Sequence, residues 1–182
     1  MIKGKKIKLR ALEKNDLEKW VRWLNDAEVT KFTTIIYPFS MEEEEEWYRK
    51  TTADQNIKNF IIETLKGKAI GGISLNKINW KDRNAELGIV IGEKDFWNKG
   101  YGTDAVRTLL DFTFSEMNLH RIYLRVFAYN KRALRAYEKC GFKVEGEIRD
   151  DIFRDGRYHN SYFMGILSGD FKKGMGQKSH KK

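Results

Sequence analysis

The spacing of the apolar residues changes at one point in the chain, and this change constrains the fold more than any other feature. Three runs of strand-like composition occupy residues 59–64, 69–75 and 85–91. After Gly100 and Gly102 the apolar residues recur at helical spacing and predict a helix of about four turns. Its apolar face is formed by Val106, Leu109, Leu110, Thr113, Phe114 and Met117. A strand therefore passes into a helix across a glycine-rich loop, as in mixed α and β domains.

Helix signals flank this junction on both sides. Asn15 or Asp16 can cap a helix whose apolar residues are Leu17, Trp20, Val21 and Leu24. Ser40 followed by Glu43 forms a capping box that opens a helix running through Trp47. Asn130 can cap a short helix that ends at Cys140, with Gly141 as its left-handed C-terminal residue.

The remaining apolar runs read as strands. They lie at residues 5–10, 121–127, 142–148 and 158–167, the last two separated by an Asp155-Gly156 turn. The whole pattern predicts an α+β domain with one central sheet over residues 1–171, a size that suits a single domain. Residues 172–182 follow as a basic tail that we expect to be disordered.

Charge is concentrated at the two ends of the chain. The net charge is +9, but residues 1–10 and 172–182 each contribute five basic side chains and no acid. Residues 11–171 hold 25 basic and 26 acidic side chains, so the body is not a basic nucleic-acid platform. The chain shows no secretory signal, no stretch long enough to span a membrane, and a lone Cys140 that offers no disulfide or zinc pair. We therefore expect a cytoplasmic protein without a metal site.

The segment 87–103 carries the first chemical signal. Its glycines lead into a helix N-terminus, where unpaired backbone N–H groups and the helix dipole can hold a phosphate or pyrophosphate, with Lys99 adding charge. The loop lacks both the GK[ST] of a P-loop and the third glycine of a Rossmann motif. Alternatively, the glycines only relax a loop that enters a helix.

The segment 130–142 carries the second signal. Tyr137 lies two turns after Asn130, and its phenol could donate a proton to a departing thiolate. The competing interpretation is a core tyrosine whose hydroxyl is satisfied by the backbone.

Together the two segments resemble the GNAT superfamily of N-acetyltransferases, and specifically its RimJ/RimL-like branch. The acetyl-CoA motif reads Trp97-Asn98-Lys99-Gly100-Tyr101-Gly102, with Trp97 where the superfamily has Gln or Arg, a variation that this branch tolerates. The later segment matches the pattern Asn-x-x-Ala-x-x-x-Tyr-x-x-x-Gly-Phe throughout. The resemblance covers residues 5–168. It implies a mixed, mostly antiparallel sheet, flanked by about four helices and splayed at a central strand pair that holds acetyl-CoA.

The resemblance also implies roles for individual residues. The strand 86–91 should pair through Ile89, Val90 and Ile91 with the pantetheine arm, and N–H groups near Ile91 should stabilise the oxyanion. The residues expected to bind the rest of the cofactor are Trp97, Asn98, Lys99, Gly100, Tyr101, Gly102, Thr103, Asn130 and Ala133. Tyr137 would protonate the CoA thiolate. Glu86 would take the amine's proton through water, unless it is only a salt-bridged strand carboxylate.

The amine acceptor is less constrained. By analogy with the branch, the leading candidate is the N-terminal amine of a ribosomal-type protein. A polyamine, aminoglycoside or amino sugar is the alternative, because Glu42 to Glu46 could attract a polycation, although these acids also suit a solvated helix start. A non-catalytic acyl-CoA sensor and an RNA-binding protein are further hypotheses. A homodimer and contact of the basic tail with the ribosome are expected partners.

Overall fold

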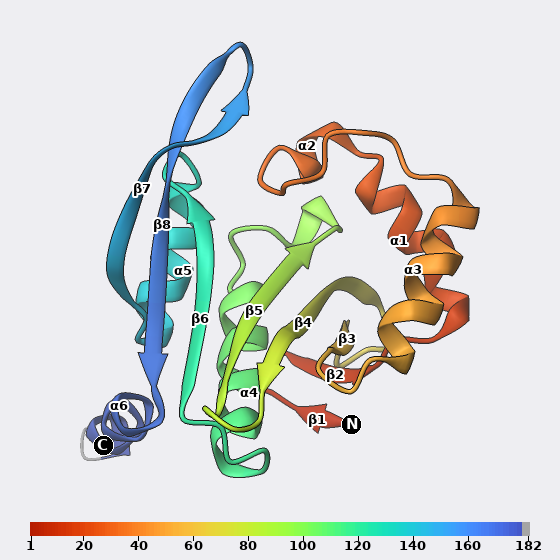
Figure 1. Cartoon of the computed structure of the whole chain (residues 1–182). Coiled ribbons are helices and arrows are strands. Elements are labelled where there is room, and N and C mark those ends of the chain that lie inside the picture. Colours follow the sequence, from red (N-terminus) through yellow and green to blue (C-terminus); the bar gives the residue numbers. More distant parts are fainter. Residues whose placement is uncertain (180–182) are drawn as a thin grey trace.

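One eight-stranded sheet forms the centre of the computed structural model, which describes the backbone of residues 1–179 and the side chains of residues 1–173 (Figure 1). The strands are β1 (Ile2–Lys3), β2 (Ile7–Ala11), β3 (Lys58–Thr64), β4 (Ala69–Asn79), β5 (Asn84–Ile91), β6 (Arg121–Phe127), β7 (Lys143–Arg154) and β8 (Arg157–Leu167). Their order in the sheet is β1-β2-β3-β4-β5-β6-β8-β7. All neighbours are antiparallel except β5 and β6. The predicted mixed, mostly antiparallel sheet is confirmed.

The described residues form six α-helices rather than the predicted four or so. They are α1 (Leu17–Leu24), α2 (Ala27–Thr30), α3 (Met41–Ala53), α4 (Tyr101–Ser115), α5 (Lys131–Cys140) and α6 (Ser168–Ser179), with short 3-10 turns η1 (Lys14–Asp16) and η2 (Lys94–Phe96). Figure 1 shows α4 and α5 behind the sheet, and α1 and α3 beside its β3 and β4 side. The unpredicted α2 has four residues, too few to show a helical apolar period.

The tail that the sequence predicts to be disordered, residues 172–182, overlaps the last helix of the fold. Helix α6 continues to Ser179, and residues 180–182 lie outside the described part of the chain. The start of α6 is fixed by tertiary contacts. Phe171 packs against Phe114 with ring centroids 5.5 Å apart, and Asp170 pairs with Lys143 at 2.9 Å. A helix docked in this way is not visible in local composition.

The capping signals have mixed outcomes. The Ser40–Glu43 capping box is present at α3, Asn130 accepts the N–H of Ala133 at α5, and Gly141 ends α5 with φ 100°. Asp16 is the N-cap residue of α1, one of the two candidates predicted, but its side chain makes no capping hydrogen bond to that helix. The Asp16 carboxylate instead takes two hydrogen bonds of 2.7 Å from the guanidinium of Arg10.

The core lies between the sheet and helix α4. Ala85 and Leu87 of β5 and Ile122 and Leu124 of β6 are buried with α4 residues such as Leu109 in one cluster. Alternate residues of β5 and β6 therefore face α4, and the residues between them face the opposite side of the sheet.

Candidate active site

The hydrogen bonding between β5 and β6 stops halfway along the two strands. Only Asn84, Ala85 and Glu86 of β5 pair with β6, whereas β4 stays paired with β5 as far as Ile91. Beyond Glu86 the parallel strands separate, as Figure 1 shows. The expected splayed central pair is therefore confirmed.

The polar groups of β5 that lose a partner point into this opening. The N–H of Gly92 donates to Ile70 at 2.9 Å, on the β4 side. Because N–H and C=O groups alternate between the two edges of a strand, those of Ile91 and Ile89 face the gap toward β6. The carbonyl of Ile91 accepts from Trp97, so the opening presents the N–H groups of Ile91 and Ile89 and the carbonyl of Ile89, which an extended chain with amide groups can satisfy.

A cavity of about 770 Å³ fills the opening and brings the sequence-predicted residues together. Its lining contains Glu86, Ile89, Val90, Ile91, Trp97, Asn98, Gly100, Tyr101, Gly102, Thr103, Asn130, Ala133 and Tyr137. Lys99 is the one predicted residue that does not line it. The backbone carbonyl of Lys99 accepts a 2.8 Å hydrogen bond from the side chain of Lys6, which lies beyond the loop.

The loop before α4 has the geometry of an anion-binding site. Gly100 is the N-cap of α4 with φ 83°, a left-handed conformation that favours glycine. Asp104 fixes the first turn from outside by accepting the N–H of Lys6 at 2.7 Å. The free N–H groups at the start of a 15-residue helix then carry positive partial charge toward the cavity.

Trp97 does more than replace a Gln or Arg. Its indole Nε1 donates a 2.7 Å hydrogen bond to the carbonyl of Ile91, which ties the loop to the end of β5. The guanidinium of Arg132 lies 3.9 Å from the centre of the Trp97 ring and 5.2 Å from that of Phe32. Burial lowers the pKa of Arg132. The sequence did not identify Arg132 as a site residue. Its position on the first turn of α5, two residues after Asn130, was the available signal.

Tyr137 projects from α5 into the cavity wall and is 9% exposed. Its ring packs against Phe142 with centroids 5.8 Å apart. Burial raises the pKa of Tyr137 above its usual value, and the neighbouring Cys140 adds to the effect. Because its pKa is raised, the phenol of Tyr137 stays protonated at neutral pH in the wall of the cavity. Cys140 itself is buried, with Sγ 3.5 Å from the carbonyl of Thr103.

Glu86 shows both features that the sequence left as alternatives. It lines the cavity, and its Oε2 pairs with Nζ of Lys77 at 2.8 Å. The hydrogen bond to Glu86 raises the pKa of Lys77. Lys77 lies at a break in the β4–β5 register and has φ 50°, so the strand is bent where it meets Glu86.

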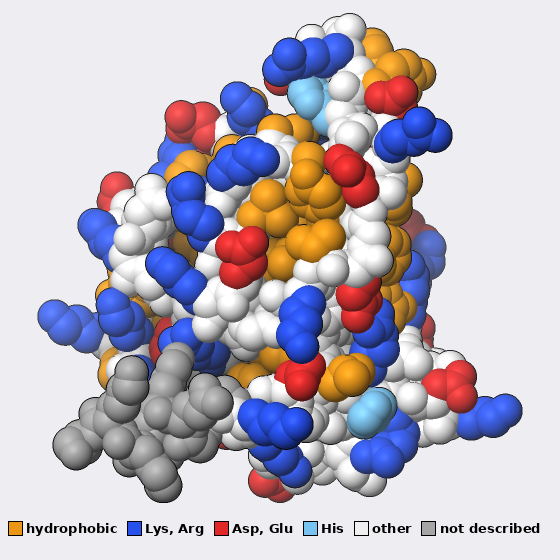
Figure 2. Space-filling model, turned by 90° about the vertical axis from the view of Figure 1, so that its left-hand side faces the viewer, with side chains coloured by type: hydrophobic (Ala, Val, Ile, Leu, Met, Phe, Trp, Pro, Cys, Tyr) orange, Lys and Arg blue, Asp and Glu red, His pale blue; other side chains and the backbone are white. Residues whose placement is uncertain are grey.

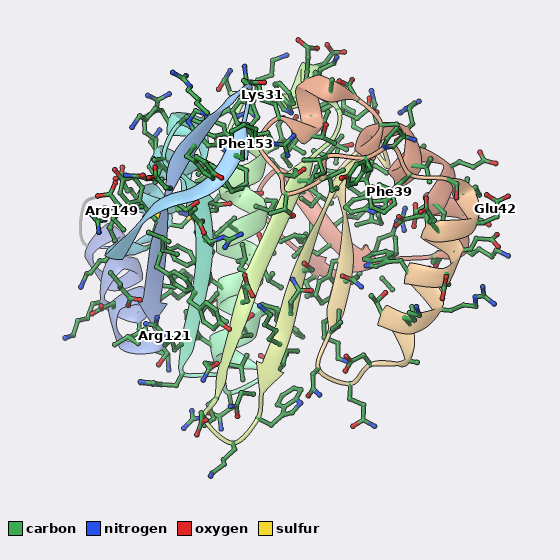
Figure 3. All side chains as sticks on the ribbon, turned by 45° about the horizontal axis from the view of Figure 1, so that its top comes forward. Lys31, Phe39, Glu42, Arg121, Arg149 and Phe153 are labelled. Carbon is green, nitrogen blue, oxygen red and sulfur yellow. The ribbon has the colours of Figure 1, made fainter. Side chains whose placement is uncertain are left out.

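The segment after α2 lines part of the cavity, with Phe32, Thr33 and Thr34. The guanidinium of Arg154 donates to the carbonyls of Thr33 and Ile35, both at 2.7 Å, and Tyr129 donates its hydroxyl proton to the carbonyl of Lys31 at 2.8 Å. Figure 3 shows Lys31 beside the β7–β8 hairpin that carries Phe153. These contacts join residues that lie about a hundred positions apart and fix this part of the cavity wall.

The acidic run of α3 does not project into this cavity. Glu43 completes the capping box, Glu45 pairs with Lys14, and Glu46 pairs with Lys50. Glu44 is buried, and Figure 3 shows Glu42 at the outer end of α3. The geometry therefore favours the interpretation of these acids as helix-start residues.

Within the described residues, no three His, Cys, Asp or Glu side chains gather closely enough to hold a metal ion. The described helices also include none with the length and apolar character needed to cross a membrane.

Comparison with known proteins decides the family. The family model described as Acetyltransferase (GNAT) domain matches residues 6–143. The chain belongs to the GNAT acetyltransferase family. It is an N-acetyltransferase that uses acetyl-CoA as the donor.

Several relatives of this GNAT chain are polyamine enzymes. A spermidine N(1)-acetyltransferase of Vibrio cholerae is 35% identical over 164 residues, which cover 90% of this chain and 94% of that protein. One of Escherichia coli strain K12 is 33% identical, over 91% of this chain and 88% of the relative. The crystal structure of the Vibrio cholerae enzyme with CoA and spermine superposes with a TM-score of 0.85 at 33% identity, covering 92% of this chain and 98% of that chain. These relatives support the family, but not specifically the RimJ/RimL-like branch.

Proposed function

We propose that this GNAT enzyme transfers the acetyl group of acetyl-CoA to a primary amine of a polyamine such as spermidine. The observation that carries the proposal is the similarity, over nine-tenths of the chain, to spermidine N(1)-acetyltransferases at 33–35% identity. The proposal replaces the protein N-terminal amine favoured by the sequence analysis with its stated alternative. Shape and hydrogen bonding in the cavity, rather than the acidic run of α3, would then select the acceptor.

The cavity suggests where the donor lies. The pyrophosphate would bind the N–H groups at the start of α4, between Asn98 and Thr103. The pantetheine amides would pair with Ile89 and Ile91 across the gap, with Asn130 and Ala133 on the other side. Arg132, whose guanidinium has no acidic partner within the described residues, would face the cofactor's negative charge.

The chemistry follows from that placement. The neutral amine attacks the thioester carbonyl carbon, a C–N bond forms, and the backbone N–H of Ile91 stabilises the oxyanion. The C–S bond then breaks, and Tyr137 gives its proton to the departing thiolate. A water bound to the free Oε1 side of Glu86 carries away the ammonium proton. No covalent enzyme intermediate forms, which agrees with the buried position of Cys140.

The test is release of free CoA thiol with a panel of acceptors. The panel holds spermidine, spermine, aminoglycosides, amino sugars, and peptides that begin with Ala, Ser, Thr or Met. We expect turnover of the polyamines alone. Turnover confined to the peptides would overturn the proposal. It would favour a second candidate, an acceptor like that of the putative ribosomal N-acetyltransferase YdaF of Bacillus subtilis, which is 26% identical over 181 residues.

The expected homodimer stays a prediction. The edge strand β7 and its neighbour β8 expose apolar side chains, and Figure 2 shows hydrophobic side chains gathered on this side of the molecule. They include Val144, Phe153, Tyr158, Phe163 and Leu167. A second copy could cover this face. Sedimentation of the full chain measures the mass directly. Contact of the basic tail with ribosomal RNA also stays a prediction.

A further inference from the structure

A second hollow lies beside the catalytic cavity, over the β3–β5 part of the sheet. Its volume is about 160 Å³, and Gly88, Ile89 and Val90 of β5 line both spaces. Trp20 of α1 and Trp47 of α3 form its wall. The hollow therefore adjoins the catalytic cavity along β5.

The two tryptophan rings are arranged to present their faces. Their centroids are 6.3 Å apart and their planes differ by 13°, so they stack. Trp20 lies close to the sheet at Gly72, where a Cβ atom would come within 2.5 Å of the ring. Trp23 on the same helix is 3% exposed and serves the core, whereas Trp20 and Trp47 are only half-buried. Their remaining exposed surface faces the hollow.

The floor of the hollow adds hydrogen-bond acceptors. Asn76 of β4 lies directly opposite Glu86 in the β4–β5 register. The Nδ2 of Asn76 donates to Oγ of Ser74 at 2.9 Å. The side-chain carbonyl oxygen of Asn76 is therefore the atom that can accept a hydrogen bond from a ligand. The described residues supply no donor to that oxygen. Aromatic faces beside amide oxygens suit an alkylammonium chain, because the rings attract both methylene groups and cations.

We propose that this hollow, the aromatic subsite (Trp20, Trp47 and Asn76), binds the non-reacting arm of the polyamine acceptor. The inference rests on the proposed function and deepens it. Two strand spacings, about 10 Å, separate β5 from β3. A spermidine molecule with one primary amine beside Glu86 is long enough to cross that distance and place its internal ammonium against the tryptophan rings. The subsite thus distinguishes polyamines from short amines.

The test uses Trp47→Leu, because Trp47 lacks the close backbone contact that Trp20 makes at Gly72. The matched control is Trp80→Leu, since Trp80 is 50% exposed and lies outside both hollows. We expect Trp47→Leu to raise the KM for spermidine about tenfold, the loss typical of a desolvated cation–π contact. The kcat and the KM for acetyl-CoA stay unchanged. Trp80→Leu changes none of the three.

Two further results separate the possible failures. Absence of spermidine turnover by the wild-type enzyme overturns the proposed function and this subsite with it. Wild-type turnover with an unchanged spermidine KM in Trp47→Leu overturns the subsite alone. If Trp47→Leu also loses acetyl-CoA binding, Trp47→Phe decides, because it keeps a ring in the wall. A rise of about threefold in spermidine KM supports the subsite, and no rise overturns it.

Discussion

Replacing Tyr137 by phenylalanine tests the proposal that the Tyr137 hydroxyl is the general acid that protonates the CoA thiolate. The substitution removes the hydroxyl and keeps the ring that packs against Phe142. Tyr137 lines the cavity, and the substitution deletes only its hydroxyl oxygen, so no apolar packing is lost. We therefore expect the free energy of unfolding to change by less than about 1 kcal/mol.

The effect on turnover should be far larger. A positioned general acid contributes about 10²- to 10⁴-fold to the rate, which corresponds to roughly 3–5 kcal/mol of transition-state stabilisation. Because burial raises the pKa of Tyr137 above its usual value, the phenol is fully protonated throughout the neutral range. The wild-type kcat should therefore show no alkaline decline from this group below about pH 10. The variant should lose activity equally at every pH in that range.

The assay is CoA thiol release at saturating spermidine and acetyl-CoA, with acetyl-CoA affinity measured by calorimetry. Tyr158→Phe is the control, because Tyr158 is 62% exposed on the β7–β8 hairpin and loses the same hydroxyl. We expect a kcat at least 100-fold lower for Tyr137→Phe, with acetyl-CoA affinity preserved, and no change for the control. An unchanged kcat with intact cofactor binding would refute the assignment.

Three more predictions concern other buried or cavity-lining groups. Glu86→Gln should lower kcat about 100-fold at pH 7, with partial recovery at high pH as the amine loses its proton unaided, measured as a pH–rate profile. Trp97→Phe removes the indole donor to Ile91 and should weaken acetyl-CoA binding about fivefold by calorimetry. Burial raises the pKa of Glu44 to about 7. Below about pH 4.5 this carboxyl is protonated in both the folded and the unfolded chain. Between about pH 4.5 and pH 7 it ionises only in the unfolded chain, so the free energy of unfolding falls by about 3 kcal/mol. Urea unfolding should show Glu44→Gln gaining that amount over wild type at pH 8 relative to pH 4, whereas Glu42→Gln gains none.

Local signals in the sequence were sufficient where a few neighbouring residues determine the geometry. The capping box at Ser40, the Asn130 cap and the left-handed Gly141 all act within one turn of chain. The change of apolar spacing at Gly100 located the strand-to-helix junction for the same reason. The cavity lining followed from two motifs on either side of that junction, and only Lys99 failed to join it.

Features that depend on distant partners could not be predicted. Asp16 stands at the N-cap of α1 without a capping bond, and its carboxylate is instead held by Arg10, on a different element. Helix α6 depends on Phe114, more than fifty residues away, and the wall after α2 depends on Arg154 of the β7–β8 hairpin. Arg132 became a candidate only when the fold placed it against the Trp97 ring. In each case the deciding contact is tertiary, and one sequence contains no record of it.

Charge counted along the chain is a poor guide to charge at the acceptor site. Four of the five consecutive acids of α3 are used for capping, ion pairing and an energetically costly burial at Glu44. The acid that lines the cavity among the described residues is instead Glu86, paired with Lys77. A polycation that binds there must compete with this resident cation for the carboxylate, so it gains little from simple attraction. Selectivity for a polyamine then has to come from length and from the tryptophan faces, which is why the Trp47 variants bear on the acceptor more directly than removal of the acidic run would.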